Sequence, residues 1–600
     1  MYVKRTLYAL IHGIFRFSEE TRRSKCARSD GRTLREILYY GDVLSYMREQ
    51  RSGRKEFIKK YEQVCDNNAE KMAITYLLDS GDKKLFTYKD LHELSKSLSE
   101  KLCKVGLTQG DRVAIISVLS PYCYIAYFAF VYAGLTAVII DPQLPEQEKD
   151  RLLANADIRG IVSSEAVYDN YANHFDKEMP VLNIENGQGF VEKCSATLLP
   201  TSDPDIDAAA ILYSSGTTSQ AKGVVIGFEQ QIRATVVDLE FVGTNDIRWL
   251  EVYPFFHISG LSSSLAILFN GAEIGLIENV SAVKLQQAFQ SYRPNTFALV
   301  PKVYEVFEGK VREAIKEKGA FAESVLLTLM RLCGFIRKHS GLNIGKYLFA
   351  SVNRQLFGGQ MKFLGVGGGL SKPKTIEFFL QLGFVWFNTY ASTEANVPIT
   401  ATTYKDRYPL FSSGRVDRFP NVSIKINSPN ASGEGEILVQ SDLLLKGYFR
   451  DPELTSAAFD EYGYFKTGDL GFVNKKNELI ITGRAKEFIG LHSGEKVSPE
   501  DIERLYTEVI TSAPFACAAV PCKAGDFDEA HLFIVIGELS KDEQQDLRKR
   551  IMMFSSQTGT LYQISVIHFI DELPTTSVGK VKRFQLKEIA LAELSGGSTL

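Results

Sequence analysis

From about residue 56 onward, hydrophobic positions form two alternating kinds of segment. Short apolar runs typical of buried strands recur, centred on Ile161, Val181, Ile211 and Ile274. Longer segments have helical spacing, such as residues 88–105, whose leucines recur every three or four positions. Alternating strands and helices are typical of a parallel sheet with crossover helices. The pattern therefore predicts an α/β fold.

The stretch from Val113 to Ile140 contains no charged residue and is long enough to raise the question of a membrane span. Pro121 and Gly134 divide it into a strand, a helix and a second strand. A strand–helix–strand unit buried in a parallel sheet is apolar throughout. We therefore favour a buried unit of the sheet over a membrane helix.

From about Gly433 the pattern shifts to short strands and turns. Within it, Thr467–Asp469 is interpreted as a turn with a free carboxylate. Ser498, Pro499 and an acid at residue 500 form a good helix start. The remaining residues, to about 587, are roughly a hundred positions of mixed α and β, the size of a small domain.

The length of 600 residues is too great for one core, so more than one domain is expected. A net charge of -3 gives no overall attraction to nucleic acid. The eight cysteines are scattered without a C-x-x-C pair, which favours reduced thiols in a cytoplasmic protein over a zinc site or a disulfide framework.

Residues 1–55 differ from the rest because they carry a net charge of about +7. An apolar run, Thr6–Phe15, is flanked by Lys and Arg, but no small-residue cleavage site follows it. One interpretation is a basic amphipathic segment that touches the anionic inner face of a membrane. The other is a helical extension packed on the main domain, or a frayed end. The sequence supports these two interpretations about equally.

The segment Tyr213–Gly223 is a small, hydroxyl-rich loop between two apolar runs. Such a loop can turn several backbone N–H groups inward, and its hydroxyls add donors and metal ligands. Lys222 supplies a mobile positive charge. It is not a Walker loop, because five residues separate Gly216 from Lys222 and because Gly223, not Ser or Thr, follows the lysine. The chemistry suits a polyphosphate; the alternative is a solvated connection between strands.

Other candidates are weak when taken singly. His257, in an apolar turn, is more often a packing residue than a catalyst. The glycines around 367–369 either allow the backbone to approach a ligand or another segment closely, or simply form a turn. Gly579 and Lys580 place an exposed ammonium on a flexible basic loop, or form a solvated turn.

Together, seven segments resemble the motifs of the adenylate-forming superfamily in their order and spacing. They are Tyr213–Gly223, Pro254–Gly260, Tyr390–Glu394, Thr467–Asp469, Gly483–Glu487, Ser493–Glu503 and Pro574–Arg583. The resemblance covers roughly residues 60–590. It implies a large N-terminal domain of stacked, mostly parallel sheets with a distorted β-barrel subdomain, and a small mobile C-terminal α+β domain. The corresponding ranges are 1–55 (extension), 56–486 (large domain), 487–590 (small domain) and 591–600 (tail).

A narrower resemblance, to bacterial long-chain fatty acyl-CoA synthetases, lies in the middle of the chain. It rests on Val300–Glu305, a long helical stretch from Ala320 to about Leu356, Leu356–Phe363, Gly367–Leu370 and Gly483–Glu487. It implies that a fatty acid reacts with ATP to give an acyl-adenylate and pyrophosphate, and that coenzyme A then gives acyl-CoA and AMP.

The resemblance also implies roles for individual residues. Residues implied to bind ATP are Ser214, Ser215, Gly216, Thr217, Thr218, Lys222, Tyr390, Thr393, Asp469, Arg484 and Lys580. Thr218 and Glu394 would hold Mg²⁺, and with Lys580, which would bridge the carboxylate and the α-phosphate, they form the implied catalytic set. Residues implied to border the acyl group are His257, Gly260, Gly367, Gly368, Gly369 and Ala391. Glu487 would be the hinge, and Ser493, Gly494 and Glu495 would face the thiol acceptor.

Four positions depart from the superfamily pattern: Ser219, Ala221, Ala391 and Gly490. None removes a charged catalytic group, so we expect activity. Two alternatives to the CoA ligase stay open. One is an acyl-AMP ligase that passes the acyl group to an acyl carrier protein. The other is a degenerate lipid- or nucleotide-binding protein, against which the retained charged residues argue.

Overall fold

The fold was analysed in a computed structural model, which describes most of the chain after residue 52. The described residues are 53–172, 179–186, 208–214, 221–237, 246–369, 371–396, 398–403, 406, 408–419, 421–484, 487, 489–490, 496–511, 513–522, 527–537, 539–559, 562–576 and 580–596. All belong to one unit, Ser52–Leu600. The basic extension therefore lies almost wholly outside the described residues.

One sheet of the large domain has seven strands in the order β17-β8-β7-β4-β3-β5-β6. They are β3 (Arg112–Ile116), β4 (Thr136–Ile140), β5 (Gly160–Ser163), β6 (Val181–Asn183), β7 (Ala208–Ser214), β8 (Lys222–Gly227) and β17 (Gly447–Tyr448). The five strands from β7 to β6 are parallel, whereas β8 and β17 join antiparallel at one edge. The mostly parallel sheet expected from the hydrophobic pattern is thus confirmed.

A second sheet has eight strands in the order β14-β13-β12-β11-β9-β10-β1-β2. They are β1 (Met72–Leu77), β2 (Lys83–Thr87), β9 (Arg248–Leu250), β10 (Glu273–Ile277), β11 (Thr296–Leu299), β12 (Phe363–Val366), β13 (Val385–Ala391) and β14 (Pro398–Ala401). Only the two edge pairs, β1–β2 and β13–β14, are antiparallel.

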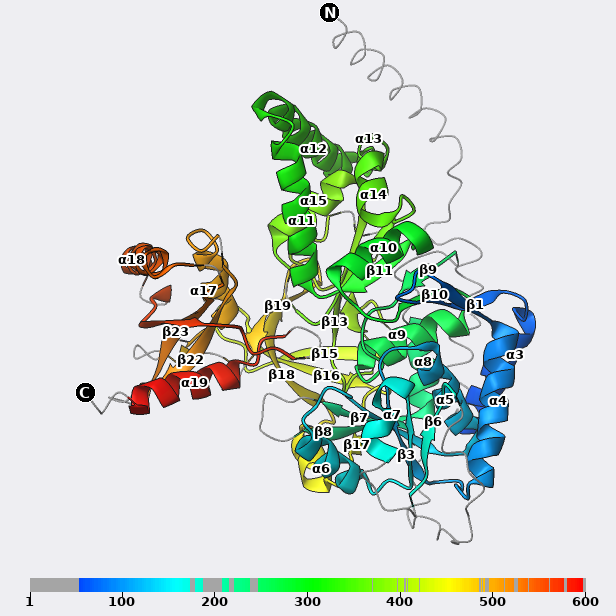
Figure 1. Cartoon of the computed structure of the whole chain (residues 1–600). Helices are drawn as coiled ribbons and strands as arrows, with labels where there is room; N and C mark the ends of the chain where they lie inside the picture. The colour runs from blue at the N-terminus through cyan, green and yellow to red at the C-terminus, as the bar shows by residue number, and fades with distance from the viewer. Residues whose placement is uncertain are drawn as a thin grey trace, which may run out of the picture. The chain divides into compact units, whose positions relative to one another are not determined.

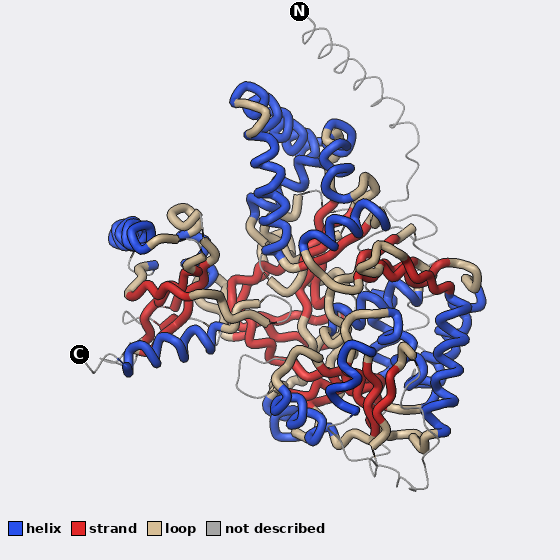
Figure 2. The backbone as a smooth tube through the Cα atoms, in the orientation of Figure 1, coloured by secondary structure: helices blue, strands red, loops and turns tan. Residues whose placement is uncertain are grey.

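Helices cover these sheets, as Figure 2 shows in blue around the red strands. Those before residue 300 are α3 (Arg54–Asn67), α4 (Tyr88–Lys104), α5 (Pro121–Ala133), α6 (Glu146–Ala156), α7 (Glu165–Ala172), α8 (Phe228–Val237), α9 (Ile258–Phe269) and α10 (Ala282–Tyr292). Those after it in the large domain are α11 (Pro301–Lys316), α12 (Ala320–Ser340), α13 (Gly345–Leu348), α14 (Ala350–Phe357), α15 (Pro373–Leu382) and α16 (Pro452–Ala457).

Helix α5 explains the long uncharged stretch. Ten of its thirteen residues are buried, and it packs beside α4 and α3 (Figure 1). A helix that is apolar on every side belongs in a core. None of the helices in the described part of the chain is long and apolar enough to cross a membrane. The preference for a buried sheet unit is therefore confirmed.

The short strands expected after residue 433 are present, and with β15 they form a four-stranded antiparallel sheet, β15-β16-β18-β19. Its strands are β15 (Val422–Asn427), β16 (Gly435–Ser441), β18 (Phe465–Val473) and β19 (Leu479–Arg484). The C-terminal α+β part follows. It comprises β20 (Ile489–Gly490), β21 (Lys496–Val497), α17 (Pro499–Tyr506), β22 (Phe515–Pro521), β23 (Asp528–Val535), α18 (Lys541–Gln557), β24 (Val566–Ile570) and α19 (Arg583–Gly596). Its own cluster of buried side chains includes Ile502, Leu532 and Ile551. Helix α19 runs past residue 590 to Gly596.

Candidate functional site

The hydroxyl-rich loop connects two antiparallel strands, β7 and β8. Their pairing sets Tyr213 opposite Gly223 and Ser214 opposite Lys222, so the two ends of the loop are held together. The loop residues themselves, 215–220, lie outside the described residues. The roles of Ser215, Gly216, Thr217 and Thr218 as a phosphate cradle, and of Thr218 as a metal ligand, therefore stay predictions.

Lys222 and Glu394, predicted from separate motifs, meet through Tyr448. The Lys222 ammonium lies 5.4 Å from the centre of the Tyr448 ring, and the Tyr448 hydroxyl donates to Glu394 Oε1 at 3.1 Å. The Glu394 backbone carbonyl accepts from the Leu445 N–H at 2.7 Å. Sequence reasoning missed Tyr448 because nothing in its neighbourhood marks it. The pairing of β17 with β8 brings it to this place.

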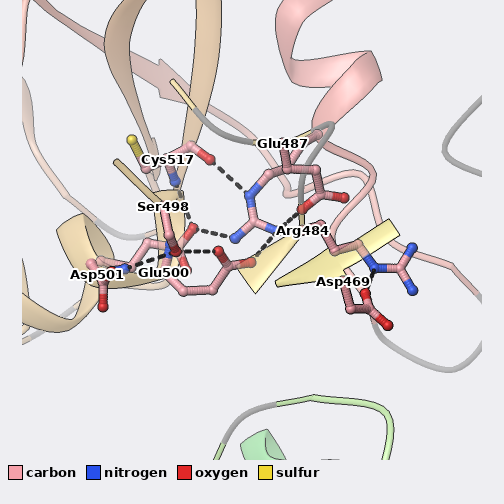
Figure 3. A network of polar contacts seen from close by, with 9 residues as sticks. Asp469, Arg484, Glu487, Ser498, Glu500, Asp501 and Cys517 are labelled. Carbon is pink, nitrogen blue, oxygen red and sulfur yellow. Dashed lines mark hydrogen bonds and ion pairs between the residues drawn. The ribbon is translucent and has the colours of Figure 1, made fainter. Parts of the chain in front are cut away.

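Asp469 is central to a second cluster of predicted residues. Its Oδ2 accepts from the Tyr390 hydroxyl at 2.6 Å, and its Oδ1 lies 3.0 Å from Arg484 Nε. Asp469 and Arg484 are direct partners on β18 and β19 and lie side by side in Figure 3. The prediction of a turn with a free carboxylate at Thr467–Asp469 was wrong. These residues lie inside β18, and the carboxylate is buried and paired.

The glycines at 367–369 leave room beside β12 and β13. A Cβ on Gly367 would lie 2.9 Å from Thr389 Oγ1, and one on Gly369 would lie 3.4 Å from Pro301. Gly368 has a φ of 75°, which non-glycine residues rarely adopt. A close approach is thus present at Gly367, and the backbone conformation favours glycine at Gly368.

Lys580 reaches these glycines from the C-terminal part of the chain. Its Cε lies 3.3 Å, and its Nζ 3.7 Å, from the point that a Cβ on Gly368 would occupy. Surrounding protein atoms, and next the charge of Arg484, lower the pKa of the Lys580 ammonium, whereas Asp469 and Glu487 oppose this. Lys580 retains exposed surface, so water as well as the carboxylates of Asp469 and Glu487 favours its charged form.

His257 lies at the start of α9. Its Nδ1 accepts from the Ser259 N–H at 3.1 Å, which caps the helix, and its ring stacks on Tyr253 with 5.8 Å between centres. A Cβ on Gly260 would collide with the Pro254 carbonyl. The turn is therefore closely packed, in accord with the interpretation of His257 as a packing residue.

Burial, and secondly the charge of Lys580, lower the pKa of His257 to about 4. We expect its ring protons to titrate near pH 4 in NMR spectra. Because the unfolded chain binds this proton at about pH 6.5, its contribution to folding stability is lost as pH falls from about 6.5 towards 4. In the Lys580→Ala variant the titration should move upward. Titration of His257 near pH 6.5 in the unaltered protein would contradict this assignment.

Glu251 supports the same turn and was not predicted. It is buried, and it accepts hydrogen bonds from Trp249 Nε1 at 3.0 Å, from the backbone N–H groups of Val252 and Tyr253, and from the Ser264 hydroxyl at 3.1 Å. Burial raises the pKa of Glu251 to about 7, although these donors oppose the shift. An acid within the apolar run that continues past β9 was the only signal available in the sequence.

Glu487 is held by a network centred on Arg583. Arg583 Nη1 lies 3.1 Å from Glu487 and 3.0 Å from Glu500, and Nη2 lies 2.8 Å from Glu503. Its Nε donates to the Cys517 carbonyl at 3.0 Å. Figure 3 shows Glu487, Glu500 and Cys517 of this network close together. Three carboxylates thus share one cation, and that cation lies three positions after Lys580.

The remaining predicted residues are not brought into these clusters. Ala391 ends β13 with its side chain exposed, and Thr393 lies in the turn that follows. Ser493, Gly494 and Glu495 lie outside the described residues. No group of three or more His, Cys, Asp or Glu residues suited to a metal ion occurs in the described part of the chain.

The known proteins that this chain resembles are AMP-binding enzymes and CoA ligases. The profile of the family described as AMP-binding enzyme matches residues 61–449. The chain is 24% identical to a 2-succinylbenzoate–CoA ligase of Listeria monocytogenes, covering 84% of this chain and 94% of that protein. It is 24% identical to 4-coumarate–CoA ligase 2 of Petroselinum crispum, covering 88% and 94%.

Among solved structures, the chain resembles the o-succinylbenzoate coenzyme A synthetase of Bacillus subtilis in complex with ATP and magnesium ion. The TM-score is 0.67 at 21% sequence identity, covering 88% of this chain and 99% of that one. This likeness confirms the predicted fold class. These three relatives are named for succinylbenzoate and coumarate, not for fatty acids.

Proposed function

The chain belongs to the family of AMP-binding enzymes, and from this premise we propose that it is an ATP-dependent, AMP-forming ligase that joins a carboxylic acid to coenzyme A. The observation that carries the proposal is the meeting of Lys580 with Gly368, near the Asp469–Arg484 pair. Three features lie close together here: the Lys580 cation, the paired carboxylate of Asp469, and the glycine that follows β12. Together they suit the reaction of a carboxylate with a nucleotide.

The nucleotide would be held by the Asp469 cluster. An ionised carboxylate accepts hydrogen bonds from ribose hydroxyls, and Asp469 is fixed for this by Tyr390 and Arg484. The Arg484 side chain is 46% exposed. Its guanidinium can therefore still reach a phosphate. The Tyr390 ring would lie against the adenine.

Magnesium fits the residues present. The Glu394 carboxylate is a hard oxygen ligand of the kind that Mg²⁺ takes beside phosphates, and the Tyr448 hydroxyl orients it. Glu394, with Thr218, would hold the ion, which neutralises phosphate charge when bound. Lys222, over the Tyr448 ring, adds a second positive charge from the start of β8.

Lys580 would act at the reacting atoms. A carboxylate oxygen attacks the α-phosphorus of ATP, the bond to the bridging oxygen of pyrophosphate breaks, and acyl-AMP forms. Both reactants are anions, so a cation between them lowers their repulsion, and it stabilises charge on the phosphate in the transition state. In the second step the thiol of coenzyme A attacks the acyl carbonyl and AMP leaves. Glu487 would be the hinge that exchanges Lys580 for the residues at 493–495 between these steps.

The acid substrate is proposed to be a long-chain fatty acid. Support comes from the helical segment α11–α14, which follows the order of motifs in the long-chain synthetases. Helix α11 begins at Pro301, within the Val300–Glu305 segment on which that resemblance rests. An aryl acid is the second candidate, since the similar ligases of Listeria and Petroselinum are named for succinylbenzoate and coumarate.

A panel of acids decides between these substrates. We expect purified protein with Mg²⁺ to exchange pyrophosphate into ATP in the presence of long-chain fatty acids and to form thioesters when coenzyme A is added. If coumarate or succinylbenzoate supports exchange and no fatty acid does, the proposed substrate is wrong but the proposed AMP-forming reaction stands. Exchange without a CoA thioester, but with transfer to acyl carrier protein, would change the acceptor. No exchange with any acid would refute the proposal.

A further inference from the structure

Helix α12 exposes large apolar side chains along one face. Phe321, Val325, Leu332 and Phe335 are 85%, 43%, 48% and 61% exposed, respectively. Positions three, four or seven apart lie on the same side of a helix, so these four form one stripe. The other side packs on α11 and α15 and buries Met330. The stripe is therefore an outer face of the helix.

Three more exposed apolar side chains follow in the next segment, where α13 packs on α12 (Figure 1). Leu342, Tyr347 and Leu348 are 49%, 73% and 44% exposed. Seven of the seventeen large hydrophobic side chains that are exposed among the described residues thus fall within residues 321–348. Single exposed apolar residues need no explanation, but a gathering of this kind marks an interaction site. We call these seven side chains the insert face.

Positive charge predominates around the insert face, since α12 carries one acid, Glu323. The chain contains no Asp or Glu between Glu323 and Glu377. Four exposed cations occur in the same segment, at Arg331, Lys338, Lys346 and Arg354. The Lys346 ammonium lies 4.7 Å from the Tyr347 ring centre, so cation and aromatic group are directly interleaved. Helix α11, packed behind, adds no net negative charge, because it has four cations and three acids.

We propose that the insert face docks on an anionic lipid bilayer, with α12 lying along its surface. Helices at the membrane interface combine an apolar face containing Phe and Leu with flanking Lys and Arg, and anionic lipids attract each cation near the surface. A second copy of this chain would bring like charges together across a two-fold axis. The chain's own extension, residues 1–55, is also basic. Charge thus favours the bilayer over both, and this inference does not depend on the proposed function.

Flotation of the full chain with vesicles tests the proposal. Vesicles of phosphatidylcholine alone are compared with vesicles that also contain phosphatidylglycerol. We expect stronger flotation with the anionic vesicles, reduced by salt. Replacing Arg331, Lys338 and Lys346 together by Gln should weaken partitioning to anionic vesicles roughly a hundredfold, since each surface cation contributes about fivefold.

A second variant removes the apolar contribution. Phe321→Ser, Phe335→Ser and Tyr347→Ser together should abolish most binding to both kinds of vesicle. The matched control is Phe411→Ser with Tyr462→Ser, which are 69% and 66% exposed elsewhere on the chain; it should float like the unaltered protein. Because all these side chains are exposed, circular dichroism should be unchanged in each variant.

Three results would overturn the proposal. Equal flotation of both insert-face variants and the unaltered protein would assign any binding to another segment, such as residues 1–55. Equal loss in the control variant would show a general effect of exposed aromatic groups. A dimer in sedimentation that the serine variant dissolves, without vesicle binding, would make the insert face a contact between copies.

Discussion

Replacing Lys580 by Ala is expected to lower acid-dependent pyrophosphate exchange by ~10²-fold or more, the usual scale for loss of one charge-stabilising donor. The loop that carries Lys580 is tied back by Thr576 N–H to Lys580 O at 2.7 Å and by Lys582 N–H to Pro574 O at 2.8 Å. Removing only the ammonium therefore leaves the loop in place. In the proposed mechanism Lys580 acts only in adenylation, so thioester formation from synthetic acyl-AMP and coenzyme A should change little.

The matched control is Lys582→Ala, two positions away on the same loop. It removes an equal charge from the basic segment but not from the neighbourhood of Gly368, so exchange should stay within a few-fold of normal. If both variants lost exchange equally, a general electrostatic effect of the loop would explain the result. If Lys580→Ala lost both half-reactions equally, a role confined to adenylation would be wrong.

Replacing Arg583 by Gln is expected to destabilise the C-terminal part of the chain by about 3 kcal/mol or more, because removing one partner of a buried ion pair leaves uncompensated charge. Only 15% of the Arg583 side chain is exposed, and it faces three carboxylates. Both tryptophans, Trp249 and Trp386, lie outside this part. Hydrogen exchange of peptides from α17 and β22, followed by mass spectrometry, is therefore the suitable measurement.

The pH dependence of the Arg583→Gln variant gives a sharper test. Burial already raises the pKa of Glu487 and of Glu503, while Arg583 opposes the shift. Without the guanidinium both pKa values should rise further. A carboxyl whose pKa is higher in the folded state binds its proton more tightly there, so lowering the pH from neutral towards these raised values should restore stability.

Arg504→Gln provides the control for this variant. Arg504 lies on α17 and pairs with Asp501 at 2.8 Å, but 58% of its side chain is exposed. Exposed pairs contribute about 1 kcal/mol at most, so hydrogen exchange should hardly change. A similar loss in both variants, or a further loss of protection in Arg583→Gln at lower pH, would contradict the role given to the buried network.

The sequence predicted the fold to the extent that its signals are local. Apolar runs marked the strands of both large sheets, and leucine spacing marked α4. Ser498 does cap α17, accepting from the N–H groups of Glu500 and Asp501. These features depend on neighbours within a few positions, so the sequence alone indicates them. The order of the motifs likewise indicated the adenylate-forming superfamily before any contact was known.

What the sequence could not indicate depends on contacts between distant residues. The prediction of a free carboxylate at Asp469 failed because its partners, Tyr390 and Arg484, come from another sheet and another strand. Arg583 and Glu487 are 96 positions apart, and Tyr448 gains its meaning only through the β17–β8 pair. Helix α12 illustrates the same limit, since only the folded structure shows which of its apolar residues are exposed.

By itself, then, the sequence determined which residues form strands and helices, where the polar candidates lie along the chain, and which family they resemble. Only the tertiary structure decided which of those candidates meet, which carboxylate is paired, and which apolar residues of α12 face outward. The physical reason is that propensity and capping act over a few residues, whereas burial and ion pairing depend on which distant segments the folded chain brings together.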